Sequence, residues 1–247
     1  MPTFLPASSG VVRNPLTQIE SAEKFPQALN RLAKSVGMSR LPMPYMGRFK
    51  PSALSDELGE RFRDHGSDKA GHRYHLIYGH ILEKLGRENP LNLLEIGIGS
   101  QNPEVASHMP SEYQPGALLR AFRDTLPLAT VYGGDVDKDV LFSEKRIKTT
   151  WVDQTVPESF DTLDDVFGSP EFDLIIDDGL HTVEANINTL VYGLSRLSKT
   201  GWIVIEDIWH AQACWRNVQS ILPVEKYDTN LYEFENGLSI FVVRRMS

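Results

Sequence analysis

Two short apolar runs that each end in acidic residues constrain the fold of this chain more than any other feature. The first covers residues 172–177 and the second covers residues 202–206. Neither run alternates apolar with polar residues, which is typical of strands that are buried on both faces of a parallel sheet. Between them, residues 182–197 have the apolar spacing of a helix, and Gly201 follows. These segments predict a strand–helix–strand unit.

Acidic residues stand at the end of both strands. Consecutive parallel strands end at the same edge of a sheet, so Asp178 is expected to lie close to Glu206 and Asp207. Three crowded carboxylates repel one another unless a cation lies among them, and oxygen ligands suit Mg²⁺ or a similar hard cation. His181 would place a candidate base beside that ion. The pattern therefore predicts a metal site at this edge.

The composition is that of a globular protein. A length of 247 residues suits one large α/β domain. The formal net charge of −8 and the lack of a basic stripe disfavour a nucleic-acid partner. The first residues do not read as a signal peptide, and no apolar stretch approaches the roughly 20 residues of a membrane span. With a single cysteine, Cys214, no internal disulfide can form, so we expect a soluble, cytoplasmic protein without a membrane partner.

Strand and helix signals alternate along most of the chain. The expected strands lie at residues 91–98, 130–135, 147–153, 172–177, 202–206, 225–231 and 238–244. The expected helices lie at residues 17–36, 56–63, 74–85, 116–125, 157–167, 182–197 and 209–222. Asn236-Gly237 is a strong hairpin signal, which makes the last strand antiparallel.

This alternation predicts an α/β fold with a doubly wound, Rossmann-like, mostly parallel sheet of seven strands, the last one antiparallel. Residues 1–65 are expected to form a helical and loop extension that acts as a lid or as a contact in a homo-oligomer. Residues 66–247 are expected to form the main domain.

A glycine-rich turn follows the first strand, where one residue separates Gly97 from Gly99. Glycines let the backbone approach a ligand closely, and sheets of this kind bind cofactors in the crevice at the strand ends. A dinucleotide motif needs a third glycine that opens a helix, but Asn102-Pro103 follows instead, which disfavours an NAD site. Glu95 lies inside the apolar strand, and a buried carboxylate must be hydrogen-bonded or paired.

The next two strands also end in polar residues. Asp135 is well placed to accept hydrogen bonds from the two hydroxyls of a ribose, and Asp153 with Gln154 could meet the edge of an adenine. Taken singly, each of these acids is better explained as a loop residue or a helix cap. Their placement at three successive strand ends favours a cofactor of nucleoside type.

Together these motifs resemble the class I S-adenosylmethionine-dependent methyltransferases. Within that class, they are most similar to the metal-dependent sugar O-methyltransferases of macrolide biosynthesis, the mycinamicin and tylosin enzymes. The resemblance covers about residues 62–210, and it rests on residues 67–69, 74–75, 94–99, 116–120, 132–135, 153–154, 177–181 and 205–207. Leu180 departs from the family pattern, which usually has a small polar residue at this position.

The resemblance implies a class I methyltransferase domain at residues 66–247 that uses S-adenosylmethionine and Mg²⁺ or another divalent cation. It implies metal ligation by Asp178, Glu206 and Asp207, with His181 as the catalytic general base. The residues that it places at or near the cofactor are Glu95, Gly97, Gly99, Asp135, Asp153, Gln154, Asp177, Ser67 and Lys69. The implied reaction methylates a hydroxyl of a small polyhydroxylated substrate, such as the sugar of a natural product made in antibiotic biosynthesis.

Two other functional classes fit parts of the pattern. A nucleotide-dependent oxidoreductase could use a similar sheet, although the missing third glycine counts against it. A catalytically silent binding module could keep the fold, but three buried carboxylates without a cation would destabilise it. For either acidic motif alone, a turn or a helix cap is an equally good explanation, whereas both motifs with His181 favour the metal site.

Overall fold

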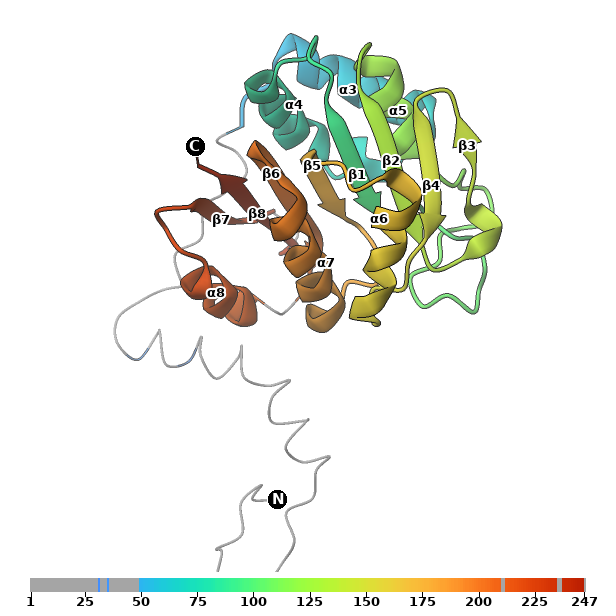
Figure 1. Ribbon diagram of the computed structural model, residues 1–247. Coiled ribbons are helices and arrows are strands. Elements are labelled where there is room, and N and C mark those ends of the chain that lie inside the picture. The colour runs from blue at the N-terminus through green and yellow to red at the C-terminus, as the bar shows by residue number, and fades with distance from the viewer. Residues whose placement is uncertain (1–30, 32–34, 36–48, 210–211, 235–236, 247) are drawn as a thin grey trace, which may run out of the picture.

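The computed structural model describes residues 31, 35, 49–209, 212–234 and 237–246 (Figure 1). Most of the expected helix at 17–36 and of the loop after it lies outside these residues, as does part of the turn at 235–237. The role expected for residues 1–65, as a lid or a subunit contact, stays a prediction. Within the described residues, no helix combines the length and the apolar character needed to cross a bilayer.

An eight-stranded sheet forms the centre of the molecule, in the order β3-β4-β2-β1-β5-β6-β8-β7. Its strands are β1 (Asn92–Ile96), β2 (Thr130–Asp135), β3 (Ser143–Glu144), β4 (Ile147–Trp151), β5 (Phe172–Asp177), β6 (Leu197–Ile208), β7 (Tyr227–Glu233) and β8 (Ser239–Arg245). The strands from β4 to β6 are parallel, and β8 runs antiparallel to both β6 and β7. The expected mostly parallel sheet with an antiparallel last strand is confirmed, and the two-residue β3 is an addition to the seven expected strands.

Helices cover both faces of this sheet (Figure 1). On one face lie α3 (Ala53–Asp64), α4 (Tyr74–Leu85) and α5 (Ala117–Thr125), and on the other lie α6 (Asp161–Phe167), α7 (Val183–Arg196) and α8 (Gln212–Ile221). Three short 3₁₀ turns complete the described elements: η3 (Asp68–Ala70), η4 (Lys138–Val140) and η5 (Pro157–Phe160).

The alternation of side chains along each strand divides the interior into two apolar cores. In β6, Val204 faces the core under α3, α4 and α5, whereas Ile203 and Ile205 face the core under α6, α7 and α8. The same alternation holds in β5, where Ile175 and Ile176 belong to different cores. A strand that is buried on both faces needs a continuous apolar run, which is why the runs in the sequence identified these strands.

Strand β6 begins five residues before the expected strand, at Leu197 instead of Trp202. Leu197 pairs with Phe172 of β5 across an irregularity in the register, and its carbonyl accepts a hydrogen bond of 2.6 Å from the Arg245 side chain. These contacts extend the chain where a helix end and a turn were expected.

Helix α3 lies within the expected extension of residues 1–65, and it contributes the fully buried Leu58 and Phe62 to the core under α3, α4 and α5.

Candidate active site

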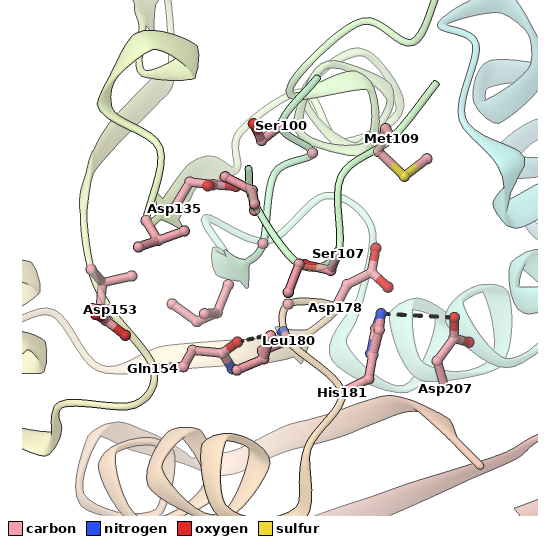
Figure 2. Close-up of a pocket in the computed structure, with 18 of the residues that line it drawn as sticks. Ser100, Ser107, Met109, Asp135, Asp153, Gln154, Asp178, Leu180, His181 and Asp207 are labelled. Atoms are coloured by element: carbon pink, nitrogen blue, oxygen red, sulfur yellow. Dashed lines mark hydrogen bonds and ion pairs between the residues drawn. The ribbon is translucent and has the colours of Figure 1, made fainter. Parts of the chain in front are cut away.

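A cavity of about 350 Å³ opens at the carboxyl edge of the parallel strands (Figure 2). Residues at or just after the carboxyl ends of β1, β2, β4, β5 and β6 line it, together with a segment of the long connection between β1 and α5. Of the residues expected at the cofactor, those in the wall are Gly97, Gly99, Asp135, Asp153 and Gln154. Asp178, His181 and Asp207 line the same cavity, so the expected cofactor side and metal side are continuous.

The glycine turn after β1 brings two strand ends into backbone contact. Gly97 has a φ of +89°, and a Cβ at this position would collide with the carbonyl group of Asp178. Gly99 has a φ of +92°, and a Cβ there would collide with the ring of Tyr113. Both positions therefore require glycine, because of the left-handed backbone and because of the space.

Asp135 braces this turn from the neighbouring strand β2. Its carboxylate accepts hydrogen bonds of 2.9 Å from the backbone N–H groups of Ile98 and Asp137. Burial raises the pKa of the Asp135 carboxyl, and these backbone donors oppose that shift. The backbone N–H of Gly99 is a third donor to this carboxylate. Three donors share the roughly four lone-pair sites of the two oxygens, so the residue can still accept a hydrogen bond from a ligand in the cavity.

Asp153 and Gln154, just after β4, differ in the hydrogen bonds that their side chains make with the protein. Oδ1 of Asp153 accepts hydrogen bonds from the backbone N–H and the hydroxyl of Thr155, at 2.9 and 2.7 Å. The side-chain amide of Gln154 is bound to three groups of the protein, which belong to Asp177, Leu180 and Thr189.

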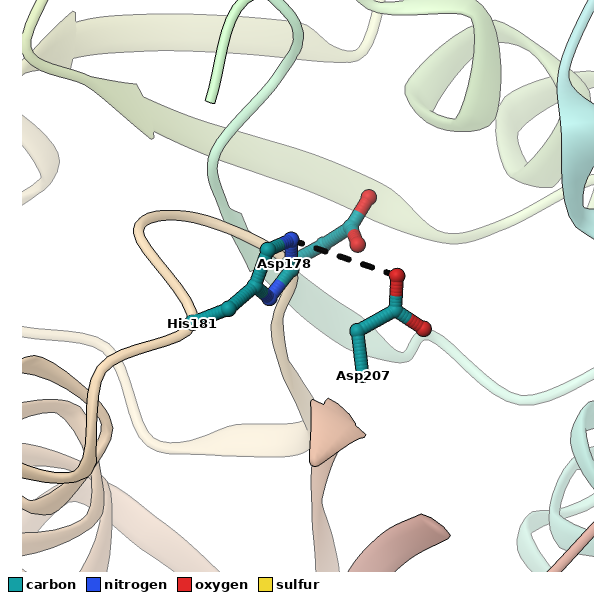
Figure 3. A group of neighbouring side chains, drawn as sticks. All are labelled: Asp178, His181 and Asp207. Carbon is teal, nitrogen blue, oxygen red and sulfur yellow. Dashed lines mark ion pairs between the residues drawn. The ribbon is translucent and has the colours of Figure 1, made fainter. Parts of the chain in front are cut away.

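Asp178, His181 and Asp207 form the group whose ligand atoms lie close enough to share a metal ion (Figure 3). One ligand atom from each residue lies within 4.8 Å of the other two, and the imidazole Nε2 of His181 is 4.0 Å from Oδ2 of Asp207. Two carboxylates and an imidazole are donors that bind divalent cations. His181 and Asp207 both have positive φ, of +59° and +52°. His181 lies in the loop after β5, and Asp207 lies near the end of β6, where the pairing with β8 is irregular.

The structure does not bring Glu206 into this group, although the sequence placed it with Asp178 and Asp207. The Glu206 side chain is completely buried, and its two oxygens accept hydrogen bonds from the Lys69 ammonium and the Tyr78 hydroxyl. Burial raises the pKa of Glu206 well above its ordinary value, and the positive charge of Lys69 opposes the shift. Glu206 is thus the inner member of a buried ion pair directly behind the cavity.

Lys69 joins Glu206 to Asp178. Its Nζ lies 2.6 Å from Oδ2 of Asp178 as well as in contact with Glu206, and the residue is 4% exposed. Burial alone would lower the pKa of Lys69, but the negative charges of Asp178 and Glu206 outweigh it and raise the pKa well above its ordinary value. Lys69 therefore carries its charge in the fold and is not part of the cavity wall.

Two tyrosines on one face of α4 complete this arrangement, and the sequence analysis did not assign them to it. Tyr74 donates a hydrogen bond of 2.5 Å to Oδ1 of Asp207, and Tyr78 donates to Glu206. Their separation of four residues, which places two side chains on one helix face, is the signal that could have linked them. Because Tyr74 occupies Oδ1, Oδ2 of Asp207 is left facing His181.

Three other predicted cofactor residues lie behind the cavity wall. Glu95 is 3% exposed, and its Oε2 has no hydrogen-bond partner among the described residues. Burial, followed by the charge of Asp178, raises the pKa of Glu95 well above its ordinary value. Asp177 is completely buried between Gln154 and the backbone of Gly179. Ser67 accepts a hydrogen bond from the backbone N–H of Lys69 and caps η3.

A further part of the wall comes from residues 104–107, Met109 and Tyr113, which the sequence analysis did not assign to the site. Oγ of Ser100 donates a hydrogen bond of 2.5 Å to Asp137, and the carbonyl of Ser100 accepts one of 2.6 Å from the backbone N–H of Met109. This connection lacks the regular spacing of a helix or strand, so its sequence gave no signal.

Comparisons with known proteins agree with this geometry. The structure superimposes on the MycE methyltransferase of the mycinamycin biosynthetic pathway, solved in complex with Mg and S-adenosylhomocysteine (SAH), with a TM-score of 0.61 at 22% sequence identity over 77% of this chain and 54% of that chain. The chain has the class I methyltransferase fold. A second MycE structure, in complex with Mg, SAH and mycinamycin VI, matches 99% of this chain and 67% of that chain with the same TM-score, at 19% identity.

Curated relatives of known activity match part of the sequence. The 8-demethyl-8-alpha-L-rhamnosyl tetracenomycin-C 2'-O-methyltransferase of Streptomyces olivaceus is 32% identical over 146 residues, which are 58% of this chain and 35% of that protein. The mycinamicin VI 2''-O-methyltransferase of Micromonospora griseorubida is 32% identical over 127 residues, 51% of this chain and 29% of that protein.

The chain thus spans about a third of the length of the curated relatives that it matches. No protein-family model matches it. The resemblance that the motifs indicated, to the class I methyltransferases and among them to the mycinamicin and tylosin sugar O-methyltransferases, is confirmed.

Proposed function

We propose that this protein is an O-methyltransferase that depends on S-adenosylmethionine and on Mg²⁺ or another divalent cation, and that its acceptor is a hydroxyl of a small polyhydroxylated molecule, the sugar part of a natural product. The observation that carries the proposal is the continuity of one cavity, in which the glycine turn and Asp135 lie beside the carboxylates of Asp178 and Asp207 and the imidazole of His181. The relatives that methylate sugars on antibiotics support the acceptor class.

The residues of the cavity fit both the cofactor and the metal ion. A cavity of about 350 Å³ is in the range of small-molecule sites, and its glycine turn allows close approach of a ligand to the backbone. S-adenosylmethionine supplies a methyl group on a positively charged sulfur. At the other end, Asp178 and Asp207 offer the oxygen donors that hard divalent cations prefer, and such an ion lowers the pKa of an alcohol and orients it.

His181 is the proposed general base. Its Nε2 is 4.0 Å from Oδ2 of Asp207, and its side chain is 27% exposed at the cavity, so a substrate hydroxyl bound there can pass its proton to the imidazole. A positioned base of this kind contributes about 10²–10⁴ in rate. Tyr74 fixes Asp207 by its hydrogen bond, and Lys69 fixes Asp178, so that both carboxylates keep their orientation when the acceptor changes.

The acidic net charge supports the absence of a nucleic-acid partner, because phosphate binding needs a basic surface. The exposed free thiol of Cys214 supports a reducing compartment, and we include a cytoplasmic location in the proposal.

The test has two steps. Calorimetric titration with S-adenosylmethionine, in Mg²⁺ and in EDTA, is expected to show cofactor binding by the wild type and by Asp178→Ala, with a separate heat for Mg²⁺ that only the wild type gives. Transfer of a radiolabelled methyl group to rhamnosyl and other sugar-bearing acceptors then tests the reaction. A folded protein that binds no S-adenosylmethionine would refute the proposal.

A further inference from the structure

Gln154 connects three secondary-structure elements through its side chain. Its Nε2 donates hydrogen bonds to Oδ1 of Asp177 at 2.9 Å and to Oγ1 of Thr189 at 2.8 Å, and its Oε1 accepts one of 2.8 Å from the backbone N–H of Leu180. Its backbone carbonyl accepts a further bond, of 2.8 Å, from the Asn188 side chain. The amide thus ties the end of β4 to the end of β5 and to the first half of α7.

Both N–H donors of the Gln154 amide are used by these contacts. The residue is 7% exposed, and Thr189 and Asp177 at its donor end are completely buried. Donation of a hydrogen bond to a ring nitrogen of an adenine would take one of these donors away from a buried oxygen of Asp177 or Thr189, which is costly.

The loop held by Gln154 is the one that carries Asp178 and His181. A Cβ at Gly179 would collide with Oε1 of Gln154, so the amide lies directly against the backbone of this loop. On its other side, the carbonyl group of Asp178 lies against Gly97. The loop is therefore fixed between the glycine turn of β1 and the amide of β4.

The fixed position of this loop matters because of the backbone conformation of His181. His181 has a φ of +59°, a left-handed conformation that costs a residue with a side chain about 1–2 kcal/mol. The hydrogen bond to Leu180 N–H holds the residue immediately before it. In this conformation the imidazole lies beside Asp207 (Figure 2). Without the bond to Leu180 we expect the backbone to relax and the imidazole to leave this position.

We propose that Gln154 is a positioning residue, whose amide holds the loop of residues 177–181 so that Asp178 and His181 face Asp207, and that it does not bind the cofactor. This inference rests on the proposed function, since it assigns Gln154 to the metal side of the site and not to the adenine side.

The test separates cofactor affinity from metal affinity. In Gln154→Met, which keeps the length of the side chain but lacks the amide, SAH affinity measured by calorimetry is expected to stay within about threefold of the wild type. Mn²⁺ affinity, measured by electron paramagnetic resonance of the free ion, is expected to fall by about 10–100-fold, as is typical when a group that orients metal ligands is lost. Thr189→Val, which removes one acceptor behind the cavity, is expected to show the same selective loss to a smaller degree, and it serves as the test if the Gln154 variant does not fold.

The outcomes are distinct. A loss of SAH affinity in Gln154→Met with unchanged Mn²⁺ binding would identify Gln154 as a cofactor ligand and overturn the inference. Equal losses of both affinities in folded Gln154→Met or Thr189→Val would also overturn it, because they indicate a general structural role. A wild type that binds SAH but no Mn²⁺ would refute the proposed metal site itself, and with it this inference, whatever the variants show.

Discussion

Replacing Lys69 with Met tests the buried ion pair behind the cavity. Met has a similar length and no charge, so the variant removes the ammonium that contacts Asp178 and Glu206 and leaves the packing nearly unchanged. Among the described residues, the completely buried Glu206 then keeps the hydrogen bond from Tyr78 alone. Removing one partner of a buried ion pair destabilises a protein by about 3–5 kcal/mol, because the other charge stays buried without compensation.

The loss should depend on pH in a defined direction. Burial already raises the pKa of Glu206 in the folded protein, and without Lys69 nothing of opposite charge opposes that shift. A carboxyl with a raised folded pKa contributes stability that is fully present below its unfolded pKa, roughly 4.3, and that is lost as the pH rises through the folded pKa. Lys69→Met is therefore expected to be less destabilising at pH 5 than at pH 8.

Urea unfolding followed by circular dichroism at both pH values, without divalent cations, measures this. The double variant Lys69→Met/Glu206→Gln removes the uncompensated charge and is expected to recover most of the stability lost at pH 8. The matched control is Lys199→Met, at an exposed lysine of β6, for which a change within about 0.5 kcal/mol is expected. A loss below about 1 kcal/mol in Lys69→Met, or a double variant no more stable than the single one, would refute the reasoning.

Three further predictions follow from the site. His181→Ala is expected to lower turnover by about 10²–10⁴ while calorimetry shows unchanged SAH binding, and loss of SAH binding in the folded variant would contradict its role as a base. Gly97→Ala is expected to lower the free energy of unfolding, measured in urea, by about 1–3 kcal/mol because of its φ of +89°, and by more because of the collision with Asp178. Gly237→Ala is the control: its φ is +86°, but no described atom lies within 4 Å of the added Cβ, so only the first loss is expected. Glu95→Gln is expected to raise the free energy of unfolding by about 1–3 kcal/mol at pH 8 and by less at pH 5, because burial raises the pKa of Glu95 and its Oε2 has no partner among the described residues. A gain in stability that does not grow with pH would count against this.

Local patterns were sufficient for most of the fold. The bounds of β2, β5 and α4 match those expected from the sequence, since buried apolar runs and helical spacing are properties of neighbouring residues. The early start of β6 could not be expected in the same way. It depends on pairing with Phe172 and on a hydrogen bond from Arg245, which is 48 residues from Leu197.

The sequence predicted where the candidate site lies in the fold but not which side chains pair within it. The topology of parallel strands brought Asp178 and Asp207 to one edge of the sheet, as expected. Side chains along a strand point alternately to its two faces, and Glu206 is two residues after Val204, which faces α4. This alternation could have predicted that Glu206 and Asp207 point to different faces. The partner of Glu206 lies 137 residues away at Lys69, and no local pattern in the sequence joins them.

The left-handed backbones of His181 and Asp207 have a consequence for how this protein can be engineered. Glycine at residue 181 would relieve a conformational cost of about 1–2 kcal/mol, so selection for thermal stability alone favours replacement of the His181 side chain. Asp207 is protected from the same selection, because glycine there would leave the buried Tyr74 hydroxyl without its acceptor. A directed-evolution library screened by melting temperature would therefore collect inactive variants at residue 181, and holding that codon fixed while selecting on turnover directs the search toward the rest of the chain.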